Sequence, residues 1–163
     1  MRVLPATPEL SPAMASAHAQ AFDAPWDEAA FEDLMAGAGV FGFVALDHDP
    51  VGVVLCRAIA GEAEVLTLAV PPWARRRGVA RALMAAALDA AGRAGAGAVF
   101  LEVAVDNAAG KRVFTYYDRG WSHDGHRRGA FGLKLPYGHY LVTVSGDAWS
   151  ETYYRVVVSW EDD

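Results

Sequence analysis

The sequence predicts one α/β domain, in which a central sheet has helices on both faces. Two observations lead to this prediction: a strand–helix–strand unit between residues 64 and 105, and antiparallel strand pairs before and after it. A length of 163 residues suits one domain and is too short for two of full size. No repeat or linker divides the chain, although the composition changes near residue 110 and residues 111–163 have an unusual character.

Two short helices are predicted at the beginning of the chain. Residues 9–22 and 26–36 are rich in alanine and have apolar residues at helical spacing. Asp23 and Pro25 separate the two segments, because both residue types favour turns.

Three strands should follow these helices. Residues 40–46 and 51–60 are rich in Val and Phe, and the polar stretch 47–50 joins them, which predicts an antiparallel pair with a turn. Residues 64–70 predict a further strand. The prolines at 71–72 should end it, because proline cannot donate a hydrogen bond to the ladder.

A long helix and a buried strand complete the central unit. Residues 78–94 have large apolar side chains at helical spacing, and Gly95 suits the end of that helix. Residues 98–105 form an almost continuous apolar run, as expected for a strand covered on both faces. We expect another helix over 107–118 and a closing hairpin of residues 140–145 and 152–160.

Composition and charge limit the function classes. With 53% hydrophobic and 21% charged residues, the chain has enough apolar surface to fold, which excludes disorder. Uncharged stretches such as 34–46 are too short to span a bilayer, and no secretory leader is evident. The single Cys56 agrees with a reducing compartment, so we expect a cytoplasmic protein without a membrane partner. A net charge of −6 argues against a nucleic-acid partner.

The strongest chemical signal is a cluster of arginines at the start of the long helix. Arg75, Arg76, Arg77 and Arg81 are four of the chain's twelve arginines and precede or surround Gly78. A helix's first turn has unpaired N–H groups and partial positive charge, so a glycine flanked by arginines favours a small anion such as a pyrophosphate. The alternative is an exposed basic loop. The position between a buried strand and a strong helix favours the anion site.

Glu102 is the second signal, because it is the only charged residue in the apolar run 98–105. A carboxylate in such a setting tends to have a raised proton affinity and can act as a general base near neutral pH. The alternative is a glutamate near the strand end whose side chain reaches water.

Other patterns do not predict a site. Gly37, Gly39 and Gly42 form a G-x-G-x-x-G motif, but it follows a helix and enters a strand, the reverse of the dinucleotide-binding context. Cys56 lies in an apolar strand and is expected to be structural. Residues 122–124 (Ser-His-Asp) are too close in sequence for a catalytic triad. No ligand spacing supports a metal at the C-terminal histidines, which are His123, His126 and His139.

The run from Arg75 to Ala80 resembles the pyrophosphate loop of the GNAT superfamily of N-acetyltransferases, (Gln/Arg)-x-x-Gly-x-(Gly/Ala). Within that superfamily, residues 1–109 are most similar to the RimI-type ribosomal-protein N-terminal alanine acetyltransferases. The resemblance implies the GNAT fold: a mixed, mostly antiparallel sheet splayed between the adjacent parallel strands 64–70 and 98–105. The pantetheine arm of the cofactor would enter the gap between these two strands.

The resemblance also implies a set of site residues. Glu102 matches the RimI-type general base. The general acid would be Tyr116 if two residues are inserted, with Tyr117 next, whereas the gapless position is Phe114. The implied cofactor-binding residues are Leu68, Ala69 and Val70 for the pantetheine, the loop residues Arg75, Arg76, Arg77, Gly78, Val79, Ala80 and Arg81 for the pyrophosphate, and Asn107.

The implied reaction is acetyl transfer from acetyl-CoA, as a cosubstrate and without a metal, to a primary amine by direct aminolysis. The most similar type implies the N-terminal α-amine of a peptide or protein, such as a ribosomal protein, as the acceptor. The alternatives are a GNAT enzyme that acetylates a small-molecule amine and an acyl-CoA-binding protein without turnover.

Overall fold

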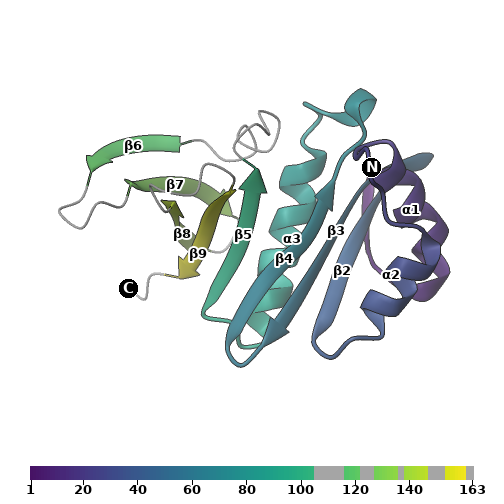
Figure 1. The fold of residues 1–163 in the computed structure, drawn as a ribbon, viewed down its shortest axis with the longest axis horizontal. Helices are drawn as coiled ribbons and strands as arrows, with labels where there is room; N and C mark the ends of the chain where they lie inside the picture. The colour runs from purple at the N-terminus through teal and green to yellow at the C-terminus, as the bar shows by residue number, and fades with distance from the viewer. Residues whose placement is uncertain (105–115, 122–126, 136–137, 147–152, 161–163) are drawn as a thin grey trace. The chain divides into compact units, whose positions relative to one another are not determined.

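The computed structural model describes residues 1–104, 116–121, 127–135, 138–146 and 153–160. The chain forms two compact units, Met1–Ala96 and Gly97–Asp163 (Figure 1). The first unit contains helices and strands, and in the described part of the second unit we find strands alone. The predicted α/β class is confirmed. The expectation that both units belong to a single domain stays a prediction.

The first unit has a four-stranded antiparallel sheet in the order β1-β2-β3-β4. The strands are β1 (Arg2–Pro5), β2 (Val40–Asp47), β3 (Asp49–Ile59) and β4 (Glu62–Ala69). The helices are α1 (Ser11–Ala19), α2 (Glu28–Met35) and α3 (Val79–Arg93), with short 3₁₀ turns η1 (Pro8–Leu10) and η2 (Pro72–Ala74). All the helices and strands predicted in this part of the chain are present. The edge strand β1 was not predicted.

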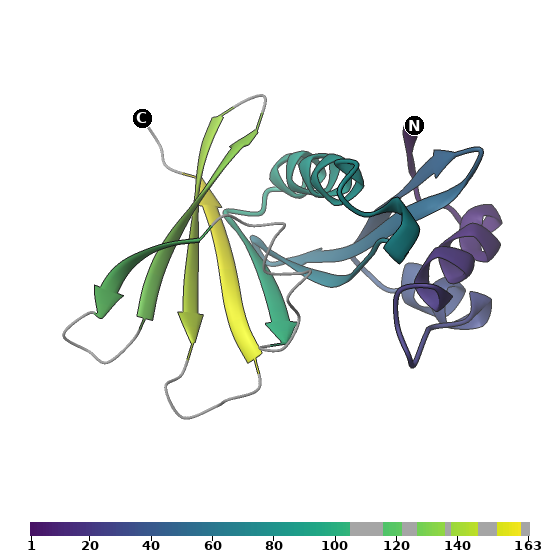
Figure 2. The same ribbon diagram turned by 90° about the horizontal axis from the view of Figure 1, so that it is seen from above.

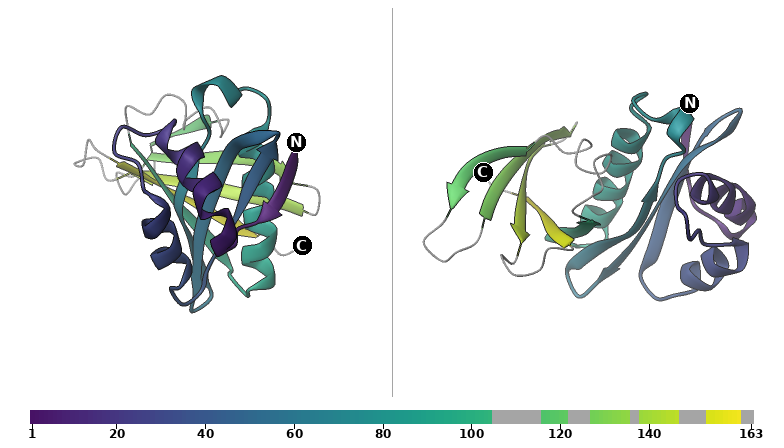
Figure 3. Two further views of the ribbon diagram at one scale, coloured as in Figure 1. Left: turned by 90° about the vertical axis from the view of Figure 1, so that its right-hand side faces the viewer. Right: turned by 45° about the horizontal axis from the view of Figure 1, so that its top comes forward.

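Helices cover both faces of this sheet, as predicted (Figures 2 and 3). Alternate residues of a strand point to opposite faces, and β3 is buried on both from Val51 to Cys56. On one face, Val53 packs in a core cluster with Met14 of α1 and Phe31 of α2. On the other face, a Cβ at Gly52 would lie 2.9 Å from side-chain atoms of both Val79 and Leu83 of α3. Gly52 therefore allows α3 to approach the sheet closely.

The core of the first unit lies mainly between the sheet and the helices α1 and α2. Its members are the fully buried side chains Met14, Ala17, Phe31, Val44, Val53, Leu55 and Ala69. Burying a large apolar side chain contributes roughly 1.5–3 kcal/mol, so this cluster is a main source of the unit's stability.

The glycines after α2 form a turn and do not form a dinucleotide site. Helix α2 begins after Asp27, whose carboxylate accepts the Ala30 N–H at 2.9 Å, an ordinary N-cap. After the helix ends, Gly39 adopts a left-handed φ of 73° before β2 begins. The interpretation of this G-x-G-x-x-G sequence as a helix-ending turn is confirmed.

Gly42 lies within β2 at a point where the two central strands leave no room for a side chain. A Cβ there would lie 2.3 Å from the Val54 carbonyl oxygen and 2.9 Å from Cδ1 of Leu55. We expect Gly42→Ala to lower the free energy of unfolding by about 2 kcal/mol or more, because a backbone oxygen cannot move aside cheaply. Urea denaturation measures this. The control is Gly92→Ala at an exposed position of α3, which should stabilise by up to about 1 kcal/mol. Equal unfolding midpoints for the two variants would contradict the account.

The second unit contains an antiparallel sheet in the order β5-β9-β8-β7-β6, as Figure 2 shows. Its strands are β5 (Ala98–Ala104), β6 (Tyr116–Trp121), β7 (Arg127–Leu135), β8 (Gly138–Gly146) and β9 (Tyr153–Trp160). The predicted closing hairpin is confirmed as the β8–β9 pair, in which Val142 lies opposite Val158. The predicted parallel neighbours, 64–70 and 98–105, fall one in each unit, and their pairing stays a prediction.

The predicted helix over 107–118 is wrong at its C-terminal end. Tyr116 and Tyr117 begin strand β6 and pair with Phe131 and Ala130 of β7. Aromatic residues favour strands, and a partner strand overrides helical spacing when one is present. Residues 107–115 of that prediction lie outside the described residues.

Among the described residues, no helix has the length and apolar character needed to cross a membrane.

Candidate functional site

The predicted anion loop lies between the end of β4 and the start of α3. Strand β4 ends at Ala69, and η2 follows the two prolines that were expected to end it. The chain then adopts left-handed φ angles at Arg76 (65°) and Gly78 (79°) before α3 begins at Val79. Left-handed backbone is unusual for a residue with a side chain, so Arg76 is held in a strained conformation by its surroundings.

Gly78 is the N-cap of α3, and its own geometry explains why glycine stands there. A Cβ at Gly78 would meet nothing within 4 Å, so the position requires glycine for its positive φ and not for lack of space. No side chain caps the helix at this residue. The first turn of α3 therefore has no side-chain cap from this residue, and the positive end of a 15-residue helix favours an anion there.

The side chains of α3 fix this helix end against the sheet. Val79 is 3% exposed and Leu83 is fully buried against β3. In contrast, Arg81 points away from the core as an exposed residue, and Ala80 is half-buried. The alternation of buried and exposed residues within one turn anchors the helix while leaving its charged side toward solvent.

The four arginines of the loop fall into two groups. Arg75 donates its Nε–H to the Val70 carbonyl at 3.0 Å, and Arg77 donates to the Asp47 carboxylate at 2.8 Å. Among the described residues, the guanidinium groups of Arg76 and Arg81 have no hydrogen-bond or ion-pair partner, and both residues are exposed. We therefore interpret Arg75 and Arg77 as groups that hold the loop, and Arg76 and Arg81 as the cations available to a ligand.

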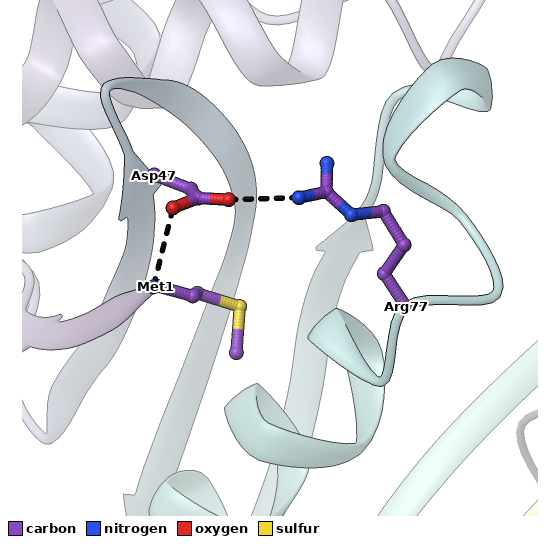
Figure 4. Close-up of polar contacts among 3 residues, drawn as sticks. All are labelled: Met1, Asp47 and Arg77. Carbon is purple, nitrogen blue, oxygen red and sulfur yellow. Dashed lines mark hydrogen bonds and ion pairs between the residues drawn. The ribbon is translucent and has the colours of Figure 1, made fainter.

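Asp47 connects the loop to the turn between β2 and β3 (Figure 4). One carboxylate oxygen accepts from Arg77, and the other lies 3.2 Å from the amino group of Met1. The Met1 ammonium, and after it Arg77, holds the pKa of Asp47 below its usual range, so this carboxylate stays charged at neutral pH. The turn itself is tighter than predicted, because His48 adopts a left-handed φ of 64° and strand pairing extends to Asp47 and Asp49.

The three residues predicted to contact the pantetheine lie at the end of β4. Leu68 pairs with Val54 and Ala69 with Val53 of β3, so the backbone there is fixed by the sheet. Val70 follows the strand, and its carbonyl accepts the hydrogen bond from Arg75. The Arg75 side chain thus ties the anion loop back to the end of β4, in addition to the covalent connection along the chain.

The predicted acid and base both belong to the second unit. Glu102 lies within β5 as predicted, and its register partner in β9 is Arg155. Tyr116 is the first residue of β6, and Tyr117 follows it in the same strand. Asn107 and Phe114 lie outside the described residues. The structure therefore places Glu102 and Tyr116 on strands and leaves their predicted roles as proposals.

Cys56 is buried, as predicted for a structural thiol, with 1% of its surface exposed. Burial raises its pKa to about 12, so almost none of it is thiolate at neutral pH. We expect alkylation by iodoacetamide to be at least about a hundredfold slower in the native protein than in urea. The native and urea rates are compared by mass spectrometry, and equal rates would contradict the burial of this thiol.

Two features that shape this site were not predicted from the sequence. Asp47 was assigned only to a turn, and no local signal connects it with Arg77, thirty positions later. Gly52 was counted as an ordinary strand residue, although a lone glycine in a buried strand does indicate close approach of another element. Among the described residues, no group of His, Cys, Asp or Glu is placed to hold a metal ion.

The chain belongs to the acetyltransferase (GNAT) family, whose model matches residues 9–116. The chain is therefore an acetyltransferase by family, and the GNAT fold expected from Arg75–Ala80 is confirmed. A search of proteins with curated descriptions finds no match.

Solved structures with the same fold include enzymes of different substrate classes. The ribosomal-protein-S18-alanine N-acetyltransferase from Escherichia coli has a TM-score of 0.68 and 18% identity, over 99% of this chain and 95% of that chain. NAA60 of Arabidopsis thaliana, in complex with acetyl-CoA, has a TM-score of 0.64 and 17% identity, over 96% of each chain. An aminoglycoside 6′-N-acetyltransferase from Acinetobacter haemolyticus has a TM-score of 0.57 and 19% identity, over 69% of this chain and 86% of that chain. At these identities the likeness is one of fold.

Proposed function

We propose that the chain transfers the acetyl group of acetyl-CoA to the N-terminal α-amine of a protein in the cytoplasm, with a ribosomal protein as the first acceptor to try. The observation that carries the cofactor part is the uncapped start of α3, with left-handed Gly78 and, beside it, two arginines that have no partner in the described part of the chain. The fold likeness to an S18-alanine N-acetyltransferase, over 99% of this chain, supports the acceptor part.

The residues of the first unit suit the phosphate end of acetyl-CoA, which supplies the acetyl thioester when bound. Val79, Ala80 and Arg81 form the first turn of α3, and their backbone N–H groups would donate hydrogen bonds to the pyrophosphate. Arg76 and Arg81 would add charge-assisted hydrogen bonds, while Arg75 and Arg77 keep the loop in shape. We assign the pantetheine to the backbone of Leu68, Ala69 and Val70, and a further cofactor contact to Asn107.

In the second unit, we assign Glu102 as general base and Tyr116 as general acid. The neutral amine attacks the thioester carbon, a C–N bond forms and the C–S bond breaks. Glu102 accepts a proton from the amine, directly or through water, and Tyr116 donates one to the departing thiolate. An α-amine titrates near about 7.7–8.0, against about 10.4 for lysine, so it needs only a modest base near neutral pH.

A second candidate is acetylation of a small-molecule amine. The observation that favours it is the likeness to an aminoglycoside 6′-N-acetyltransferase, which covers 69% of this chain at a TM-score of 0.57. The likeness to the S18-alanine enzyme covers 99% of this chain, which is more, so we rank the small-molecule amine second. The cofactor site is the same in both candidates, and they differ only in the acceptor.

The test measures thiol release from acetyl-CoA with hexapeptides that begin with Ala or Ser. The matched control uses the same peptides with a blocked α-amine, and a panel of polyamines and aminoglycosides serves as the rival set. We expect release with the free peptides alone. Release with the small amines alone would favour the second candidate. Thermal stabilisation by CoA without any release would indicate a binding protein without turnover.

A further inference from the structure

His18 of α1 is buried and makes a hydrogen bond with each ring nitrogen. The residue is 3% exposed. Its Nδ1 accepts the backbone N–H of Trp26 at 3.0 Å, and its Nε2 lies 3.1 Å from Oγ1 of Thr67 in β4. Because Nδ1 is an acceptor, the ring proton must be on Nε2, which donates to Thr67. The two contacts together fix a neutral imidazole in one tautomer.

Aromatic rings surround the imidazole. Phe22 and Trp26 stack on it, with centroids 4.4 and 5.0 Å away, and Phe31 of α2 meets it edge-on at 5.5 Å. Trp26 and Phe31 also contact each other at 5.6 Å. His18 is therefore the common neighbour of the aromatic residues that come from the connection between α1 and α2 and from α2 itself.

These contacts fix the connecting segment 20–27 to β4 and η2. His18 joins the segment to Thr67, directly before Leu68, which we assign to the pantetheine. Gln20 accepts a hydrogen bond from the indole N–H of Trp73 in η2 at 2.8 Å. Both attachments lie on the stretch of chain that leads into the anion loop. The position of segment 20–27 is therefore coupled to the backbone of the proposed cofactor site.

Protonation of His18 would break this arrangement. An imidazolium has two N–H donors and no acceptor, so Nδ1–H would face the Trp26 N–H and their hydrogen bond would be lost. The surroundings do not compensate for the charge. The nearest elements carry acidic residues in segment 20–27 (Asp23, Asp27), in α2 (Glu28, Glu32, Asp33) and in β4 (Glu62, Glu64). None of these carboxylates pairs with the ring in the described contacts: Asp27 accepts from Ala30, and Glu64 pairs with Arg57.

Of the other elements packed against α1, β3 carries Asp49, Cys56 and Arg57 and η1 carries Glu9, and none of these side chains pairs with the ring in the described contacts. Helix α1 contains no Asp, Glu, Lys or Arg, and η2 is Pro-Trp-Ala. Burial accordingly lowers the pKa of His18. The neutral ring is the stable form at neutral pH, and the charged form becomes populated only as the pH falls.

We propose that His18 is a positioning residue of the acetyl-transfer site, a role that rests on the proposed function: its neutral form locks segment 20–27 against β4, and its protonation releases that segment. The residues that hold segment 20–27 in place all belong to the first unit. The effect of His18 protonation on this segment can be measured whether or not an acceptor has been found, so failure of this proposal is distinguishable from failure of the proposed function.

The first test is a pH titration of the wild-type protein by NMR. We expect the ring nitrogens to have the shifts of the Nε2–H tautomer near neutral pH, and His18 to titrate below the ordinary histidine range. Corrected for intrinsic rates, amide exchange of Trp26 should rise by up to about tenfold per pH unit as the pH falls from the ordinary histidine range to that titration, and should level off below it. Amides of Leu83 and Leu88 in α3 should not follow it. An Nδ1–H tautomer, or a titration that leaves the Trp26 amide unchanged, would overturn the proposal.

The second test uses variants that separate the two hydrogen bonds. His18→Asn keeps an acceptor for the Trp26 N–H but cannot titrate, so protection of Trp26 should persist and lose its pH dependence. His18→Gln keeps a donor for Thr67 and should lose protection of Trp26 at all pH values. Because the segment is attached to the backbone of the proposed cofactor site, the CoA affinity of the wild type should fall several-fold at low pH, and His18→Asn should abolish that fall. If protection of the Trp26 amide in His18→Asn depended on pH as it does in the wild type, the proposed role of His18 would be wrong.

Discussion

Glu102→Gln is expected to lower kcat/KM for acetyl transfer by about 10²–10⁴-fold near neutral pH, the usual contribution of a general base. Glutamine is nearly the same size as glutamate but cannot accept the proton of the attacking amine. The loss should become smaller as the pH rises, because more of the α-amine is then neutral without help. Initial rates over a range of pH with a peptide that begins with Ala measure the effect.

The controls for this variant separate base catalysis from binding and folding. The affinity for CoA should stay within about twofold of the wild type, and the free energy of unfolding within about 0.5 kcal/mol. Glu62→Gln, at the exposed start of β4, is the matched variant and should have wild-type rates. Unchanged acetyl transfer by Glu102→Gln at every pH would remove Glu102 from the proposed mechanism.

The double variant Arg76→Ala/Arg81→Ala should weaken CoA binding by about tenfold to a hundredfold, with little effect on stability. A hydrogen bond to a charged group contributes about 1.5–3 kcal/mol, and we expect the lower end because both arginines are exposed. Their loss should also weaken the salt dependence of binding, because fewer charges are then screened. Calorimetry at two salt concentrations measures both effects.

Arginines elsewhere in the first unit provide the comparison. Arg57 and Arg93 pair with Glu64 and Asp89 on the surface, and replacing them by Ala should leave CoA binding unchanged. Arg75→Ala and Arg77→Ala should have smaller effects than the double variant, since these side chains hold the loop and do not face a ligand. Equal losses for Arg77→Ala and the double variant would contradict the division of the arginines into two groups.

The secondary structure of the first unit was largely predictable because its signals are local. Helix α3 follows from apolar spacing and from glycines at both ends, and both Gly78 and Gly95 do adopt left-handed φ. Strand β1 was not predicted, because it has only four residues and ends in proline. It exists because Arg2–Pro5 pairs with β2, which is a contact between distant parts of the chain.

The site was predictable in position but not in detail. The motif located the loop and its glycine, and Gly78 is indeed the residue that precedes the first turn of α3. Arg75 and Arg77 hold the loop because they bond to the Val70 carbonyl and to Asp47, and no local pattern in the sequence indicates either contact. The same limit applies to His18, whose role comes from Trp26 and Thr67. In the β6 region, helical spacing gave the wrong element because pairing with β7 decided the outcome.

The most direct test of the account is to locate the acetyl group on a product. A peptide that begins with Ala and contains one internal Lys is incubated with acetyl-CoA and the protein, and the product is fragmented in a mass spectrometer. The account predicts one acetyl group, on the N-terminal α-amine. An acetyl group on the lysine, or an unmodified peptide under conditions where CoA binds, would contradict it.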